Sequence, residues 1–383
     1  MSARSGAPRI LHIFGSFAAN SPPAQRAVRL MEAFGGRLAH SVVSANGDFG
    51  AADGLARGIR LQRLVSFPPL RGLPLPGRLQ RVARALQDYD LVLTYGRGAM
   101  DAALAHTMFS QVHALPPLIH HEDGSDETAR QRKRWRSRWS RRVGLGKAAG
   151  LVVPTETMEH ATLVDWQQPI GRVKRIADGV DLDALKRSPK GEAIPRLVKR
   201  PGEIWLGCRT HFDGSDAPQD ILEALRSLDD SCHLVVVGSG PQGAAFQSQV
   251  TALALDHRVH VVPQLRDPDT LVRLADVVVL SGGREPLPLL AIAAMATAKS
   301  LAGFDTPAGE VATCVADENA GLIARPGDIP AMTEALTRLT SEPYLREEIG
   351  HANRAKAEAA RSDARMIAAY RLLYASALGV DEI

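Results

Sequence analysis

The chain has 383 residues, of which 45% are hydrophobic, and its length and lack of an apolar run near 18 residues predict two globular domains without a membrane-spanning helix. Three widely spaced cysteines (Cys208, Cys232 and Cys314) argue against a disulfide framework and a cysteine metal site, and favour a reducing cytoplasm. The net charge of +4 hides an asymmetry: residues 1–190 carry 28 Lys and Arg against 16 Asp and Glu, whereas residues 191–383 carry 18 against 26, which points to an anionic surface facing the first half.

The first half of the chain alternates strand and helix patterns. Apolar and β-branched runs predict strands at residues 9–15, 40–44, 59–64, 90–94, 117–121, 150–153 and 173–176. Helices are expected to begin near residues 23, 78, 98 and 154. The first strand follows the N-terminus almost at once, without an apolar leader or a small-residue cleavage site, so we expect no signal peptide.

Residues 186–203 (KRSPKGEAIPRLVKRPGE) contain three prolines and many charges without a period, which is typical of a linker. A second alternating series follows. Its strands are predicted at 204–207, 233–238, 259–262 and 276–280, its helices at 218–228, 242–255 and 267–274, and three closing helices at 329–340, 343–360 and 363–377. Strands that alternate with helices in both halves predict two α/β domains with doubly wound sheets.

The stretch from Val278 to Gly303 carries the main motif. A buried strand pattern breaks at residues 281–283, with Glu285 at the break, and a helix rich in Leu and Ala follows Pro286 before the next strand at 300–302. This order places a helix N-terminus, with its N–H groups and positive dipole end, at the carboxyl edge of a parallel sheet. Ligands bind at that edge in open α/β sheets.

The same stretch is similar to S-x-x-E-x-x-P-x-x-L-x-E-A-M-A: Glu285, Pro288 and residues 294–296 match in register, Ser281 and Leu290 each lie one residue before their pattern positions, and Ala293 stands in place of the second Glu. Through this motif the chain resembles the family 4 retaining glycosyltransferases of the GT-B fold. The resemblance implies two Rossmann-like doubly wound domains facing each other across a cleft. They would be an acceptor-side domain at 1–185 and, after the linker, a nucleotide-sugar domain at 204–361. A last helix at 362–378 would pack back on the first domain or, alternatively, on the second domain's own core.

The resemblance assigns the donor site to several segments. Glu285 would accept hydrogen bonds from donor-sugar hydroxyls, within a turn that also includes Leu287, Leu289 and Leu290; alternatively, Glu285 only complements the helix N-terminus. In place of a Gly-Gly pair after the first strand, the chain has Asn20 and Ser21, which we place near the donor phosphates.

The expected diphosphate contacts are reduced. Family members carry G-R-x-x-x-x-K-G after the first strand of the second domain; here Arg209 matches the Arg, but the Lys position falls on Gly214 or Ser215. Only Arg209 and His211 remain to meet the leaving group, whose developing charge needs cations or donors. Replacing the ribose-binding Glu by Ala293 removes one acceptor, at a cost of ~1–3 kcal/mol in binding.

The run of residues 120–124 (HHEDG) ends a predicted strand in the first domain and is similar to a run in many family members. The resemblance implies that a histidine here approaches the transferred sugar or the acceptor, so we list His120, His121 and Asp123 with Glu285 as candidate catalytic residues. Glu122 or Asp123 would orient the imidazole. A metal site or an ordinary polar loop are the alternatives, although enzymes of this fold generally need no metal.

The segment from Arg130 to Arg142 contains eight Lys and Arg, with Trp135 and Trp139 one helical turn apart. A basic helix with flanking aromatics suits an anionic membrane surface. The alternative is a solvated helix whose tryptophans pack inward. No nucleic-acid-binding fold accompanies the run, so we expect no nucleic acid partner.

From these features we expect a cytoplasmic glycosyltransferase, peripheral on the inner face of the membrane. It would move a sugar from a nucleotide-diphosphate sugar to a glycan or lipid-linked acceptor, with retention, in the synthesis of a surface polysaccharide or glycolipid. No cofactor is expected beyond the donor substrate, and no metal. The alternative is a catalytically degenerate GT-B protein that acts as a binding or partner subunit, because three donor-site features are missing.

Overall fold

The computed structural model describes residues 6–19, 21–122, 138, 140–185, 194, 197–265, 267, 269–283, 289–307 and 309–383. The chain forms two compact units, each with its own parallel sheet. The first unit spans Met1–Asp178 and Ala364–Ile383, and the second spans Gly179–Asp363. The predicted α/β class with two doubly wound domains is therefore confirmed.

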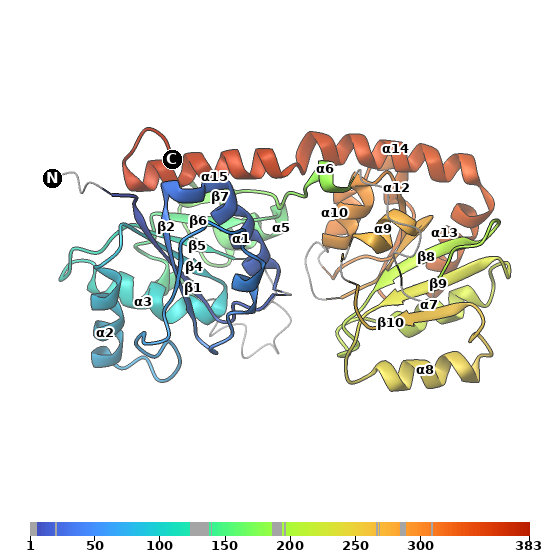
Figure 1. Cartoon of the computed structure of the whole chain (residues 1–383), viewed down its shortest axis with the longest axis horizontal. Coiled ribbons are helices and arrows are strands. Elements are labelled where there is room, and N and C mark those ends of the chain that lie inside the picture. Colours follow the sequence, from blue (N-terminus) through green and yellow to red (C-terminus); the bar gives the residue numbers. More distant parts are fainter. Residues whose placement is uncertain are drawn as a thin grey trace. The chain divides into compact units, whose positions relative to one another are not determined.

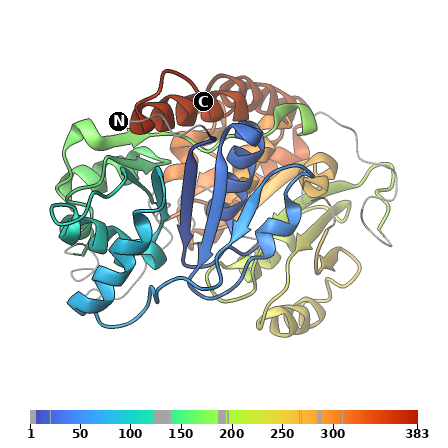
Figure 2. The same ribbon diagram turned by 60° about the vertical axis from the view of Figure 1, so that its left-hand side comes forward.

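Seven parallel strands form the sheet of the first unit within the described residues, in the order β3-β2-β1-β4-β5-β6-β7 (Figures 1 and 2). They are β1 (Arg9–Phe14), β2 (Ala39–Ser44), β3 (Leu61–Arg63), β4 (Leu91–Tyr95), β5 (Leu118–His121), β6 (Gly150–Val153) and β7 (Val173–Arg175). Strand β1 pairs with β2 on one side and with β4 on the other, so the strand order reverses between β1 and β4. The carboxyl end of such a switch point is where open α/β sheets bind ligands.

Helices cover both faces of this sheet because each strand carries apolar side chains on both faces of the sheet. Ile10 and Phe14 of β1 pack in one buried cluster, whereas Leu11 and Ile13 pack in another on the opposite face. The helices are α1 (Pro22–Phe34), α2 (Pro76–Leu86), α3 (Met100–Phe109), α5 (Glu156–Val164) and α15 (Asp363–Leu378), with short 3₁₀ helices η1 (Gly35–Arg37), η2 (Gly50–Gly54), η3 (Arg97–Ala99) and η4 (Ile170–Arg172).

The last helix, α15, packs in the core of the first unit, although it lies at the far end of the sequence (Figure 1). Met366, Tyr370 and Tyr374 are each no more than 3% exposed and join the cluster of Ile10 and Phe14. Fully burying a large apolar side chain contributes about 1.5–3 kcal/mol. The helix is therefore an integral part of the first unit.

The second unit contains six parallel strands within the described residues, in the order β10-β9-β8-β11-β12-β13. They are β8 (Ile204–Arg209), β9 (Cys232–Val237), β10 (Val259–Val262), β11 (Val277–Ser281), β12 (Ser300–Phe304) and β13 (Ile323–Ala324). The helices are α6 (Leu182–Leu185), α7 (Pro218–Leu225), α8 (Gly243–Ala252), α9 (Thr270–Leu274), α10 (Leu289–Ala296), α11 (Glu310–Cys314), α12 (Asp317–Ala320), α13 (Ile329–Ser341) and α14 (Pro343–Ala360). Again two buried clusters occupy the two faces of the sheet.

The chain leaves the first unit after Asp178 and returns to it after Asp363, so the units divide before the predicted linker at 186–203. Beside these crossings, Val180 forms a parallel bridge with Ser362. Gly179 is required here, because a Cβ would lie 2.8 Å from the backbone of Asp363. Of the predicted linker, Ile194 is buried in the core of the second unit.

Candidate functional site

A cavity of about 600 Å³ opens at the carboxyl edge of the first unit's sheet, beside the switch point between β1 and β4. Its wall comes mainly from three loops: residues 14–16 after β1, residues 95–98 after β4, and residues 70–72 before α2. Asp101 from α3 and the start of α1 complete the wall. Its position and size are those of a small-molecule site.

Glycines allow two of these loops to touch. A Cβ at Gly98 would lie 2.3 Å from the Cα atom of Gly15, and a Cβ at Gly15 would lie 3.0 Å from the Cα atom of Gly98. Gly96 has a φ of +57°, which strains residues with a side chain. The contact between the loops after β1 and β4 thus depends on this glycine-rich backbone.

Arg78 of α2 fixes the third loop. Its guanidinium donates hydrogen bonds to the carbonyl oxygens of Pro69, Leu73 and Gly72 at 3.0, 2.9 and 3.1 Å. It also forms an ion pair of 2.7 Å with Asp101, and its side chain is only 10% exposed. Because Arg78 holds both the loop and the acid, the cavity wall is organised in advance of any ligand.

Ser21, predicted near the donor phosphates, borders this cavity as the N-cap of α1. Its side chain makes no capping hydrogen bond, and Pro22 and Pro23 supply no N–H at the first helical positions. The hydroxyl of Ser21 is therefore a polar group that this corner can offer to a ligand. Asn20 lies outside the described residues.

His120 and His121 are buried and do not line the cavity. The Nδ1 atom of His120 lies 2.9 Å from the Thr94 hydroxyl, and its Nε2 lies 3.7 Å from a carboxylate oxygen of Glu122. His120 is fully buried, so its imidazole can reach a substrate only if the site rearranges. Asp123 lies outside the described residues.

His121 points instead towards α15. Its Nδ1 lies 3.3 Å from the carbonyl oxygen of Thr94, which can only accept, so Nδ1 carries the proton and Nε2 accepts from the Tyr374 hydroxyl at 3.2 Å. Burial and the nearby Arg26 and His120 hold the pKa of His121 well below its ordinary value. The ring is therefore neutral and links β5 to the last helix.

Glu122 is held by the described end of the basic segment. The Arg141 guanidinium contacts one Glu122 oxygen through both Nε and Nη2 at 2.7 Å and lies 4.8 Å from the centre of the Trp166 ring. Burial alone would raise the pKa of Glu122, but Arg141 and His120 outweigh it and lower the pKa to about 2. Arg141 therefore faces the protein interior. Most of the predicted basic helix, with Trp135 and Trp139, lies outside the described residues.

A buried polar row in this unit was not predicted from the sequence. The Tyr95 hydroxyl lies 3.2 Å from His12 Nδ1, and His12 Nε2 lies 3.0 Å from His40 Nδ1. The Tyr95 ring stacks on Phe14 at 4.0 Å and on His121 at 4.5 Å between centroids. Because Tyr95 also lines the cavity, this row supports its floor.

In the second unit, the loop after β8 contains the predicted phosphate-binding residues. Arg209 ends β8 and is half-buried, and His211 is exposed two residues later. Asp213 shares this loop; hydrogen bonds from the Ser215 hydroxyl and amide lower its pKa, so it is ionised at neutral pH. The loop therefore holds one arginine, one exposed histidine and a fixed negative charge.

Gly214, the first of the two positions matched to the family's Lys, has a φ of +82°. A Cβ there would lie 2.7 Å from the side-chain nitrogen of Gln242, so the backbone is shaped for glycine. The turn at 238–241 packs on the same loop: a Cβ at Gly238 would lie 1.9 Å from the Thr210 carbonyl oxygen, and one at Gly240 would lie 2.0 Å from that of His211. This turn thus shapes the loop after β8.

The loop after β11 begins beside the same region. The Ser281 hydroxyl donates to Asp216 at 3.2 Å, and the Ala217 amide donates to the Ser281 carbonyl at 2.9 Å. Glu285 and Leu287 lie outside the described residues, whereas Leu289 and Leu290 begin α10. Ala293, which replaces the family's second Glu, is 6% exposed and packs in the core of this unit.

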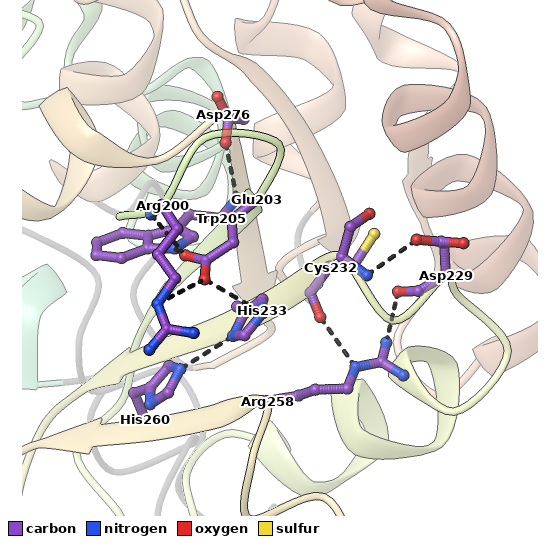
Figure 3. Close-up of polar contacts among 10 residues, drawn as sticks. Arg200, Glu203, Trp205, Asp229, Cys232, His233, Arg258, His260 and Asp276 are labelled. Atoms are coloured by element: carbon purple, nitrogen blue, oxygen red, sulfur yellow. Dashed lines mark hydrogen bonds and ion pairs between the residues drawn. The ribbon is translucent and has the colours of Figure 1, made fainter. Parts of the chain in front are cut away.

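A second polar network in this unit lies at the opposite, amino edge of the sheet (Figure 3). Glu203 accepts hydrogen bonds from the Arg200 amide and the Trp205 indole, both at 3.0 Å, and lies 3.8 Å from His233. His233 Nδ1 lies 3.1 Å from His260 Nε2. These polar groups all bind other residues of the protein. The network connects the residues at the starts of β8, β9 and β10. In the part of the chain that the structure describes, no group of three His, Cys, Asp or Glu is arranged to hold a metal.

Family comparisons agree with the division into two units. The family model for glycosyl transferases group 1 matches residues 207–356, and the model for glycosyltransferase family 4 matches residues 24–184. Each match lies on one of the two doubly wound sheets. The chain is a family 4-like glycosyltransferase of the GT-B fold.

This glycosyltransferase is 24% identical over 220 residues to the alpha-D-kanosaminyltransferase of Streptomyces kanamyceticus, a match that covers 56% of each protein. Its fold is similar to that of HepE from Anabaena, solved in complex with UDP (TM-score 0.76, 16% identity, 96% of this chain and 100% of that chain). It is also similar to sucrose-phosphate synthase from Thermosynechococcus elongatus (TM-score 0.73, 19% identity, 97% and 99%). Among the described helices, none is long and apolar enough to span a bilayer.

Proposed function

We propose that this protein transfers a sugar from a nucleotide-diphosphate sugar to a glycan or lipid-linked acceptor, with retention of configuration. The observation that carries the proposal is the match of two glycosyltransferase family models to the two units, at residues 24–184 and 207–356. Among proteins of similar fold, HepE has been solved with UDP-glucose, which supports a nucleotide-sugar donor here.

Leaving-group stabilisation would come from the second unit. As the bond to the sugar breaks, charge accumulates on the departing diphosphate, and Arg209, at the end of β8, would meet that charge together with His211 two residues later. Glu285, Leu287, Leu289 and Leu290 remain the proposed sugar-binding turn, and Asn20 and Ser21 remain proposed phosphate contacts. Such a reaction needs no protein nucleophile and no cofactor, since positioning and charge stabilisation carry the rate.

The histidines of β5 would support the reaction from behind the cavity. His120 and His121 are both buried, and His121 stacks on Tyr95, which forms part of the cavity wall. We therefore propose that His120 and His121 position Tyr95. Direct contact with the acceptor would come from residues of the cavity wall and from Asp123.

We extend this proposal to the biosynthetic pathway and to the cellular location of the protein. A glycan or lipid-linked acceptor fits the synthesis of a surface polysaccharide or glycolipid, and the basic segment Arg130–Arg142 would hold the protein on the inner, anionic face of the membrane. Arg141 and Arg138 are engaged with Glu122 and Asp165, so the outward charge would come from the remaining basic residues.

A degenerate partner subunit is the second candidate. Three features favour it: Ala293 is buried in the core, Gly214 has a backbone conformation unsuited to Lys, and Asp213 adds a negative charge to the phosphate loop. In that case the second unit would bind nucleotide weakly and the protein would act through binding alone.

Thermal shift against UDP-, GDP- and ADP-sugars tests the donor site. We expect one nucleotide to stabilise the protein, and Arg209→Gln to weaken its affinity roughly 10- to 100-fold through the lost charged hydrogen bonds. Arg226→Gln is the matched control, because Arg226 is exposed at the end of α7 and forms a surface ion pair with Glu223. If no nucleotide sugar stabilises the protein, the transferase proposal fails.

A restored cation separates the two candidates. Ser215→Lys is preferable to a change at Gly214, because Ser215 has no positive φ and is half-buried. A degenerate donor site should gain nucleotide affinity strongly, by about tenfold or more for one added charged contact. An active site rebuilt around Arg209 should show little gain, together with measurable sugar transfer or donor hydrolysis by the unmodified protein.

A further inference from the structure

We propose that the cavity of the first unit binds an anionic acceptor, one that carries a phosphate or carboxylate on its sugar or headgroup, through Arg71 and Arg97. This inference rests on the proposed transferase function and names the substrate class of its acceptor side. It concerns residues of the first unit only.

The cavity wall carries two arginines without acidic partners. Arg71 lies in the loop before α2 and Arg97 in the turn after β4; both are exposed, and neither forms an ion pair within the part of the chain that the structure describes. Some other arginines of the described first unit form ion pairs, as Arg63 does with Asp53 and Arg175 with Glu156, but the exposed Arg57 and Arg81, which lie outside the cavity, form none within the described residues. Two uncompensated guanidinium groups on one cavity wall favour an anion.

The one acid of the wall does not cancel this charge. Asp101 forms an ion pair with Arg78 at 2.7 Å. The Arg78 guanidinium also donates hydrogen bonds to the carbonyl oxygens of the neighbouring loop. Because the Arg78–Asp101 pair carries no net charge, Arg71 and Arg97 give the cavity wall a net positive charge. The excess of 28 Lys and Arg over 16 Asp and Glu in residues 1–190 adds a favourable long-range field.

The aromatic residues of the wall are unsuited to a neutral sugar. Phe14 and Tyr95 are 2% and 4% exposed and stack on each other, so they offer no open aromatic face against which a sugar ring could stack. The exposed part of the wall is Arg71, Gly72 and Arg97. A planar guanidinium fork matches a phosphate or carboxylate with two parallel hydrogen bonds.

The wall is also rigid enough to select its ligand. Arg71 belongs to the loop that Arg78 fixes, and Arg97 lies between Gly96 and Gly98, where Gly98 contacts Gly15. A volume of about 600 Å³ accommodates a phosphorylated sugar of one or two rings.

The test uses defined probes on the full chain. Glucose 1-phosphate and glucuronic acid, with glucose as the neutral counterpart, are titrated by calorimetry at low salt. Phosphatidylcholine vesicles with and without undecaprenyl phosphate test a lipid-borne source by co-sedimentation. Binding of the soluble anions indicates a free acceptor, and binding of the phosphate-bearing vesicles alone indicates a lipid-linked one; either result supports the proposal.

The variant Arg71→Gln/Arg97→Gln should lose at least tenfold in affinity for whichever anionic probe binds, and the loss should shrink as salt is added. Arg57→Gln/Arg81→Gln removes the same charge from exposed positions outside the cavity and should change the affinity less than threefold. Equal losses in both double variants, equal binding of glucose, or binding of no anionic probe would overturn the proposal. Nucleotide stabilisation, measured on the same variants, should be unchanged, so a failed donor site is recognised separately.

Discussion

At the carboxyl edge of the first unit's sheet, Arg71 and Arg97 border a cavity in which the one acid among the described lining residues, Asp101, is paired with Arg78. At the same edge of the second unit's sheet, Arg209 shares a loop with Asp213 and Asp216, and Ala293, which stands in place of the family's second Glu, offers no side-chain hydrogen bond. Two sheets of the same topology class therefore carry opposite charge balances at corresponding edges.

This difference shows that the sheet determines where a ligand can bind, while the loops determine which charge it carries. In the first unit, the loops are held by Arg78 and by the contact of Gly15 with Gly98. In the second unit, Gly238 and Gly240 have no Cβ atom, so the turn after β9 can pack closely against the backbone of the loop after β8. The two units also differ in which ionisable groups they bury: the first buries His12 and His40 together with the Glu122–Arg141 pair, whereas the charged side chains buried in the described part of the second are Arg258, Asp305 and Glu310.

The largest expected effect tests this difference in the interiors. Glu122→Ala removes the buried carboxylate that pairs with the Arg141 guanidinium and should destabilise the first unit by about 3–5 kcal/mol. Glu223→Ala breaks the exposed pair with Arg226 in the second unit and should cost less than about 1 kcal/mol. Urea unfolding, with hydrogen exchange to assign the loss to a unit, measures both. Similar losses in the two variants would contradict the contrast.

Acid should weaken the first unit before the second. Burial lowers the pKa of His40 to about 4. Burial, together with the nearby His40 and His121, holds the pKa of His12 well below its ordinary value. The folded rings stay neutral while the unfolded rings protonate near pH 6.5, so their stabilisation is complete above that pH and is lost as the pH falls towards 4. For His40 the loss is about 3 kcal/mol.

Denaturation at pH 7.5, 6 and 5, resolved by hydrogen exchange, provides the measurement. His40→Gln should flatten part of the pH dependence of the first unit. In the second unit, burial also lowers the pKa of His233 and His260, but both rings are only half-buried, so a smaller acid effect is expected there. A pH dependence that is equal in both units would rule out this explanation.

The close glycine contacts provide a third test. Gly98→Ala and Gly238→Ala each force a Cβ into backbone and should cost about 1–3 kcal/mol. Gly98→Ala should also weaken anion binding in the cavity, whereas Gly238→Ala should weaken nucleotide binding. Gly36→Ala and Gly321→Ala, with nothing within 4 Å of the new Cβ, are the matched controls. Thermal unfolding and the two binding assays together show whether each turn serves its own unit.

The smallest effect is a pair of hydroxyl deletions on α15. Tyr374→Phe removes the donor to His121 and should cost about 1 kcal/mol. Tyr370→Phe removes a buried hydroxyl that has no hydrogen-bond partner, so it should be neutral or slightly stabilising. Chemical denaturation of both variants decides the matter, and a loss in Tyr370→Phe as large as in Tyr374→Phe would show that only packing is measured.

Much of the fold followed from the sequence because hydrophobic period and turn residues are local signals. The strands at Arg9–Phe14 and Val259–Val262, and the helix Pro343–Ala360, were predicted nearly residue for residue. Short elements were missed: α11, α12 and the two-residue strand Ile323–Ala324 are too brief to show a period.

The candidate site was predictable only in part. Ser21 and Arg209 were predicted because they lie after or at the end of the first strand of each domain, where ligand loops are expected, and Ser21 does border the cavity, but the role of both residues stays a prediction. Arg71 was not found, because its place in the wall depends on α2 and on a contact with residues after β4. The run Tyr95-Gly96-Arg97-Gly98 was an available signal, since glycines around a cation follow a buried strand there. The burial of His121 depends on Tyr374, 253 residues later, which no local pattern reveals.

The last twenty residues of the chain belong to the first unit, as its two-part composition of Met1–Asp178 and Ala364–Ile383 shows. During synthesis the ribosome completes the second unit before it releases the helix that the first unit requires. The nascent first unit therefore waits with the face that Tyr370 and Tyr374 will cover still exposed to solvent. Chaperone dependence and loss of solubility on C-terminal truncation should both originate from this order of synthesis.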